Sequence, residues 1–116
     1  MDFGKKLIEI GEELQEAHLR RQKLQAQQSV FCEQVEERKL SLMPDSGWQG
    51  KNATERDAQR DRVLTKDATL RELQHYETTA TDAVAYYTAK IAGLEAVRRS
   101  IEWNITLLTY NEIPRR

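Results

Sequence analysis

Apolar side chains recur in alternating steps of four and three along two long stretches of the chain. The first series begins at Phe3 and ends at Leu42, and the second begins at Leu70 and ends at Leu108. Steps of four and three form the heptad repeat of a coiled-coil helix, whose repeated positions share one face. The pattern therefore predicts two long helices, over about residues 2–42 and 67–110. Asp2 is the expected N-cap of the first helix.

Three repeated positions of the first series are polar, namely Arg21, Gln28 and Arg38. Polar residues in such a seam either fix the register of the paired helices or extend their charged ends out of a loosely packed interface. Alternatively, they form a polar site inside a bundle. Both interpretations are compatible with the sequence.

The segment between the two series has the composition of a bend. Residues 43–52 contain one of the two prolines and two of the five glycines. Pro44 disfavours helical geometry in Met43, and the three residues after Pro44 are turn formers. Trp48 then either closes the end of the apolar stripe or stays exposed as a contact residue. We expect the first long helix to end here and the chain to reverse its direction.

A short helix is predicted after the bend, over about residues 53–64. Asn52 has the character of an N-cap, and Glu55 stands three residues later, as in a capping box. Thr65 and Asp67 are helix-start types, so a break is expected before the second long helix. Asn111 and Pro114 end the second heptad pattern, and Arg115 and Arg116 follow as a short basic tail.

These elements predict an all-α fold, an antiparallel helical hairpin or coiled coil with a short middle helix. Residues 1–116 would form one hairpin domain, which is the size of a single domain. Two helices alone bury little apolar surface, so we expect a homo-oligomeric bundle.

Composition excludes several classes of function. Eighteen Lys and Arg residues balance nineteen Asp and Glu residues, so the basic field of a general nucleic-acid binder is missing. Cys32 is the only cysteine, which rules out an intrachain disulfide and a cysteine metal cluster. The sequence has no run of about 18 apolar residues and no signal-peptide pattern. We therefore expect no membrane span, no cofactor and a cytoplasmic location.

The bend carries the candidate binding residues, which are Trp48, Lys51, Asn52, Arg56 and Arg60. A helix that opens at Asn52 presents free N–H groups and a partial positive charge, which favour an anion such as phosphate. Trp48 adds a flat apolar face for a base or for a side chain of a partner. Glu55, Asp57 and Asp61 oppose this hypothesis, because they can pair with the same arginines.

Part of the chain resembles a group of small uncharacterised helical proteins from phages and prophages. The residues that carry the resemblance are Gly50-Lys51-Asn52-Ala53, then Glu55-Arg56, then the break Thr65-Lys66-Asp67 before a long charged heptad helix. The resemblance implies an origin in a phage or mobile element and a role as an accessory in replication, recombination or interference with a host system. It brings no catalytic residues.

The sequence has no convergent set of acid, base, nucleophile or metal ligands, so we predict a protein that is not an enzyme. Two roles compete. In the first, the chain is an interaction protein that binds a host or phage protein through the surface of the coil. In the second, it binds nucleic acid or a small phosphorylated ligand at the bend. The balanced charge favours the first role.

Overall fold

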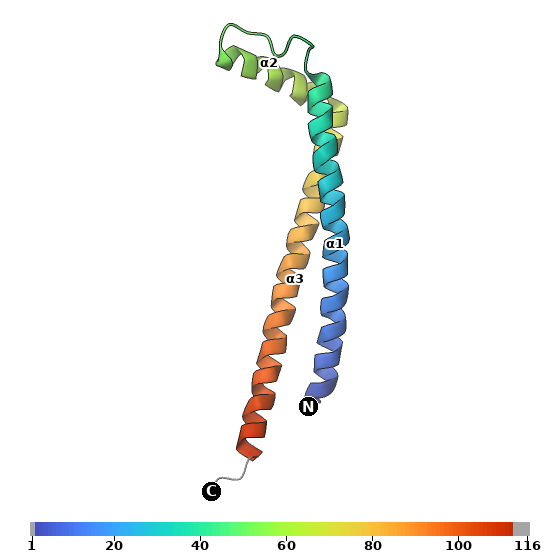
Figure 1. The fold of residues 1–116 in the computed structure, drawn as a ribbon, viewed down its shortest axis with the longest axis vertical. Coiled ribbons are helices and arrows are strands. Elements are labelled where there is room, and N and C mark those ends of the chain that lie inside the picture. The colour runs from blue at the N-terminus through green and yellow to red at the C-terminus, as the bar shows by residue number, and fades with distance from the viewer. Residues whose placement is uncertain (1, 113–116) are drawn as a thin grey trace. The chain divides into compact units, whose positions relative to one another are not determined.

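The computed structural model describes residues 2–112, and for residues 111 and 112 it describes the backbone alone. Three helices follow one another along this part of the chain, α1 (Phe3–Leu42), α2 (Ala53–Lys66) and α3 (Ala68–Glu112) (Figure 1). The predicted all-α class is confirmed. α2 runs two residues beyond its predicted end, and α3 passes Asn111 before it ends. Pro114, Arg115 and Arg116 lie outside the described residues.

Side-chain caps begin all three helices where the sequence predicts a start. The carboxylate of Asp2 accepts the backbone N–H of Lys5 at 3.0 Å. The side-chain oxygen of Asn52 accepts the N–H of Glu55 at 2.9 Å, and Asp67 accepts the N–H of Leu70 at 2.8 Å. In each case the third helical N–H, which has no partner within the helix, is satisfied.

The contacts divide the chain into two compact units. Unit 1 consists of Met1–Lys23 and Ala83–Arg116, and unit 2 is Leu24–Asp82. Each unit contains a segment of α1 and a segment of α3. Within each unit the two segments lie against each other in antiparallel directions (Figure 1). The helical hairpin is therefore confirmed at the level of this pairing, whereas the predicted oligomer stays a prediction.

Unit 1 has an apolar seam between α1 and α3. Its buried members are Ile10, Leu14, Ala17, Ile91 and Ile101. Further apolar residues are half-buried against them, namely Phe3, Leu7, Tyr87, Leu94 and Ile105. All of them occupy heptad positions of the two series, so the heptad register identifies the residues that hold this unit together.

Unit 2 has a mixed seam. Val35, Leu70 and Ala80 are buried, and Phe31 stacks at 5.5 Å between ring centroids on Tyr76. The amide of Gln28 donates to the hydroxyl of Thr81 at 2.9 Å, which joins α1 to α3. The polar seam position is thus bonded across the pair of helices, which favours the register interpretation over the alternative of a loose interface.

The heptad prediction holds more closely for α1 than for α3. All twelve repeated positions of the first series are buried or half-buried. Two repeated positions of the second series are exposed instead, Arg98 and Leu108. Because Arg98 pairs with Glu102 on its own helix, its charged end stays in water.

Candidate interaction surfaces

The bend between α1 and α2 is held by its own hydrogen bonds. The N–H of Gly47 donates to the carbonyl of Pro44 at 2.8 Å, which closes a tight turn. Gly47 has φ +80°, a conformation that favours glycine. The side-chain amide of Gln49 donates to Ser46 Oγ and to the Gly47 carbonyl, and its backbone N–H donates to the side chain of Gln59 in α2. The bend is therefore a bonded turn that is attached to α2.

Gly50 lets the bend approach the first turn of α2 closely. A Cβ atom at this position would lie 2.7 Å from the backbone nitrogen of Arg56 and 2.8 Å from the Cβ of Glu55. Such distances are far inside van der Waals contact. The glycine of the Gly50-Lys51-Asn52-Ala53 segment is therefore required by the local packing, whatever else the segment does.

The start of α2 is already occupied by a carboxylate of the chain itself. Glu55 accepts the backbone N–H of Lys51 at 2.7 Å, while Asn52 caps the helix. This arrangement differs from a standard capping box, because Glu55 bonds the residue before the N-cap. A negative charge thus stands where a phosphate would bind, which weakens the anion-site hypothesis.

The other predicted site residues do not converge on one point. Arg56 donates to the carbonyl of Gly50 at 3.5 Å, whereas Arg60 lies 3.6 Å from Asp57 and 3.7 Å from Asp61. Trp48 is half-buried, between the two outcomes predicted for it. The structure thus joins Lys51, Asn52 and Arg56 to the start of α2 and directs Arg60 to acidic neighbours along the helix.

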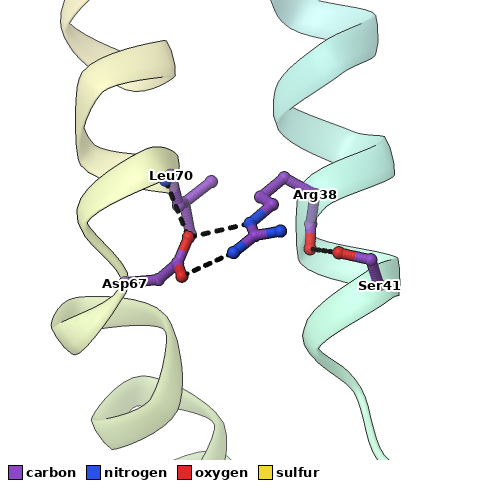
Figure 2. Close-up of polar contacts among 4 residues, drawn as sticks. All are labelled: Arg38, Ser41, Asp67 and Leu70. Carbon is purple, nitrogen blue, oxygen red and sulfur yellow. Dashed lines mark hydrogen bonds and ion pairs between the residues drawn. The ribbon is translucent and has the colours of Figure 1, made fainter.

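The best-defined polar cluster of unit 2 lies instead at Asp67, between α2 and α3. Arg38 of α1 forms a two-pronged ion pair with this carboxylate, from Nε to Oδ2 at 2.9 Å and from Nη2 to Oδ1 at 2.8 Å (Figure 2). The same Oδ2 accepts the N–H of Leu70, and the backbone N–H of Asp67 donates to the carbonyl of Leu64. One residue therefore ends α2, starts α3 and binds α1.

The bonds at Asp67 favour its ionised form. The hydrogen bonds from Arg38 and, next, from the N–H of Leu70 lower the pKa of Asp67 from 3.8 to about 2. The same pairing raises the pKa of Arg38. Both hydrogen-bonding edges of the carboxylate are occupied, so this cluster has a structural role. Arg38 thereby resolves one of the seam alternatives, since it fixes the position of α1 against the α2–α3 junction.

A shallow cavity of about 180 Å³ lies on unit 1, lined by Glu13, Glu16, Ala17, Arg20, Tyr87 and Lys90. Arg20 donates to the hydroxyl of Tyr87 at 3.2 Å and pairs with Glu16 at 2.9 Å. The volume is below the range of roughly 300–1,000 Å³ that is typical of small-molecule sites. Arg20, Glu16 and the hydroxyl of Tyr87 are bonded to one another, so we assign the cavity no ligand.

The most conspicuous surface of unit 1 is the side of α3 that faces away from α1. We call it the outer stripe, and it consists of positions Ala85, Ala89, Ala92, Ala96, Ser100, Trp103, Leu107 and Tyr110. At about 100° per residue these positions fall within an arc of roughly 80°, opposite the seam. All of them are exposed and none is charged.

The large residues of the outer stripe gather in its C-terminal half. Trp103 is 63% exposed, Tyr110 61% and Leu107 41%. An aromatic side chain would normally bury most of its area, and a helix that is apolar on two opposite sides is normally covered on both. α3 therefore has the sequence of a helix with a partner on each side, and α1 covers one side.

The outer side of α1 provides the comparison. Its exposed apolar residues are Ile8, Leu19, Val30 and Leu40, which stand ten or eleven residues apart. At 1.5 Å per residue, neighbours in this set are roughly 15 Å or more from each other. Isolated apolar residues are normal on a protein surface and need no partner. The continuous apolar surface is thus confined to α3.

The outer stripe is not among the predicted sites, although its signal is present in the sequence. Alanine is both a strong helix former and a weak apolar residue. The heptad pattern predicts that the series with the larger side chains forms the core. The row of alanines on the opposite side is then explained by their high helix propensity alone. Trp103, Leu107 and Tyr110 continue that row with large residues, and this continuation is the signal that separates a contact surface from propensity alone.

Two further observations concern the described residues. They contain no group of three or more His, Cys, Asp and Glu side chains that could hold a metal ion. None of the helices has a stretch both long and apolar enough to cross a membrane.

Comparison of the chain with protein-family models, with curated proteins and with solved structures finds no match.

Proposed function

We propose that this protein is a non-enzymatic helical interaction protein, which binds a helix of another protein chain through the outer stripe of α3. One observation carries the proposal. Eight consecutive stripe positions over seven helical turns are exposed and uncharged, and they include Trp103 and Leu107. Burying such a surface against another helix is favourable by roughly 25 cal/mol for each Å² of apolar area.

The shape of the outer stripe supports a helical partner in particular. A stripe of this width and period matches the groove-and-ridge surface of a second helix. The alanines allow helix axes to approach to about 8 Å, the lower end of the usual range. A flat sheet or a small ligand would leave most of this narrow strip, residues 85–110, in water.

The resemblance to phage and prophage proteins supplies the biological setting of the proposal. In that setting the chain is an accessory in replication or recombination, or it interferes with a host system by binding a protein. The alternative role, in which the bend binds nucleic acid or a phosphorylated ligand, is less well supported because Glu55 already occupies the start of α2.

A photo-crosslinking experiment tests the proposed function. Benzoylphenylalanine in place of Trp103 keeps an aromatic side chain at the centre of the large-residue half of the stripe. The control places it at Glu12, an exposed residue of α1 in the same unit. Irradiation of expressing cells should yield a covalent adduct with a polypeptide from position 103 and none from position 12. Equal yields from both positions, or no adduct from either, contradict the proposal.

A further inference from the structure

We infer that the chain bound to the outer stripe is a second copy of this protein, paired antiparallel about a two-fold axis at Ala96. This inference rests on the proposed function, since it names the partner of the same surface. It is carried by the sizes of the stripe residues, by the charges beside them and by the area that the pairing would bury.

The stripe is complementary to itself in size when one copy is reversed. Trp103 stands seven residues after Ala96, and Ala89 stands seven residues before it. Leu107 and Ala85 stand eleven residues on either side. An antiparallel pair centred at Ala96 therefore places Trp103 and Leu107 each at the height of an alanine in the partner. A parallel pair would place Trp103 against Trp103 and leave two rows of alanine facing each other.

The charges beside the stripe fit the same arrangement. In an antiparallel pair of helices, the same flank of each helix meets across the two-fold axis. Glu95 and Arg99 lie on one flank of the stripe. Their heights along the paired helices would differ by about 3 Å, because each residue adds 1.5 Å. Arg99 of one copy would thus meet Glu95 of the other, and the symmetry would form this pair twice.

The stripe supplies apolar area from many positions. A buried Trp side chain contributes about 150–250 Å², and Trp103 is 63% exposed in the single chain. Two copies of Trp103 therefore provide roughly 200–300 Å². The other stripe positions of both copies would supply the rest of the about 1,200 Å² at which specific interfaces begin. A two-fold interface also closes on itself, so the pairing leads to a dimer rather than a filament.

The absence of a side chain at Gly93 leaves room for a second helix to approach this side of α3 closely. A Cβ atom at Gly93 would meet nothing within 4 Å in the chain. A glycine inside a helix is unfavourable by about 1 kcal/mol relative to alanine, and no contact within the chain requires it. Its position beside Ala89, Ala92 and Ala96 keeps the surface low where the partner's Trp103 would lie.

Sedimentation equilibrium of the full-length protein tests the pairing. We expect a dimer at tens of micromolar, and Trp103→Asp should raise its dissociation constant at least about thirtyfold, the loss typical of a central hot-spot residue. Glu12→Asp on α1 is the control and should leave the constant unchanged. Circular dichroism checks that Trp103→Asp remains helical. A monomeric native protein, or an unchanged constant for a helical Trp103→Asp protein, overturns the inference.

Disulfide trapping tests the register and the direction separately. In a Cys32→Ser background, Ala92→Cys and Ser100→Cys are prepared as two single-cysteine proteins and then mixed under mild oxidation. The antiparallel pairing places position 92 of one copy at the height of position 100 of the other. It separates two copies of position 92 by about 12 Å, beyond the roughly 4.4–6.8 Å that a disulfide spans between Cα atoms.

The expected product is therefore the mixed 92–100 dimer, at least tenfold above either symmetric dimer. A product dominated by 92–92 and 100–100 dimers contradicts the antiparallel pairing. The outcomes also separate the inference from the proposed function. A native monomer that still forms an adduct with a different polypeptide through position 103 overturns the second copy as partner and leaves the proposed function standing. A native monomer without any adduct overturns both.

Discussion

Units 1 and 2 contain the same pair of helices but hold them together differently. Unit 1 relies on a continuous apolar seam around Leu14 and Ile91, and it presents a second apolar surface on the outside of α3. Unit 2 joins α1 to α3 through directed polar bonds, from Gln28 to Thr81 and from Arg38 to Asp67. Its large exposed apolar residues, Val30, Leu40, Met43 and Tyr76, do not form a continuous row along one helix.

Apolar and polar contacts make different contributions to the pairing of the two helices. Apolar contacts supply free energy but tolerate sliding by a heptad, because each heptad resembles the next. Hydrogen bonds to a charged group are strong in one geometry and are lost in the others. Unit 2 therefore fixes the register of its own segments of α1 and α3, and unit 1 supplies apolar burial within the chain.

The largest expected loss of stability comes from a substitution in the apolar seam of unit 1. Leu14→Ala removes a side chain that is 5% exposed and should lower the free energy of unfolding by about 2–5 kcal/mol. Chemical denaturation at one fixed protein concentration measures it, because the proposed association would also stabilise the folded chain. The matched control is Ile8→Ala, at an apolar residue of α1 that is 66% exposed. Equal losses for the two variants would contradict the assigned seam.

The next effect concerns the ion pair of unit 2 and its dependence on pH. The folded-state pKa of Asp67, about 2, is below its ordinary value of 3.8. The stabilisation from its ionised form is thus complete above pH about 4 and is lost as the pH falls through 2. Asp67→Asn keeps an N-cap but removes the charge. Its melting temperature should be lower than that of the native protein at pH 7.

The difference between the two proteins should shrink as the pH falls from 4 to 2. Thermal melts across this range measure it, and Arg38→Gln should flatten the profile in the same way. Arg62→Gln, at an exposed arginine of α2, should retain the native profile. A constant difference between native protein and Asp67→Asn down to pH 2 would show that the charge of Asp67 contributes nothing.

A smaller effect comes from the neutral bond of the unit 2 seam. A double-mutant cycle of Gln28→Ala with Thr81→Ala should give a coupling energy of about 0.5–1.5 kcal/mol, the usual value of a neutral hydrogen bond. Thr79 provides the control, because its hydroxyl donates to the carbonyl of His75 on its own helix. The cycle of Gln28→Ala with Thr79→Ala should show coupling near zero. Coupling of the same size in both cycles would contradict a specific hydrogen bond between Gln28 and Thr81.

The smallest effect is expected at the bend. Changing both Arg56 and Arg60 to Ala should lower the free energy of unfolding by only about 0–1 kcal/mol, because these arginines are exposed. The same double variant tests the alternative function, in which the bend binds nucleic acid or a phosphorylated ligand. If native protein binds inorganic phosphate or a single-stranded oligonucleotide at low salt and the double variant does not, the bend is a binding site. If neither protein binds, the bend is a turn.

Much of the fold follows from local sequence signals. The heptad positions predict the buried side of α1 completely, and the caps at Asp2, Asn52 and Asp67 predict where the helices start. These signals succeed because each depends on residues a few positions apart. The side of α3 that faces α1 is also predicted, apart from Arg98 and Leu108, which lie toward the end of the described helix.

The remaining features depend on contacts between distant residues. Arg38 is visible as a polar seam residue and Asp67 as a helix start, but their pairing follows from the register, and the 28 residues between them do not fix that register. The predicted site at the bend places five residues together by sequence proximity, whereas the structure directs Arg60 toward Asp57 and Asp61. The outer stripe is hard to predict because a row of alanines is explained equally well by their high helix propensity and by a contact surface.

The fluorescence of Trp103 reports whether another chain covers the outer stripe, as we propose. Trp48→Phe leaves Trp103 as the only tryptophan. Its emission should lie at the wavelength of a buried indole at tens of micromolar and move toward that of an exposed indole on dilution, while circular dichroism shows an unchanged helix content. An emission typical of exposed tryptophan at every concentration, in cell extract as in buffer, would contradict this proposal.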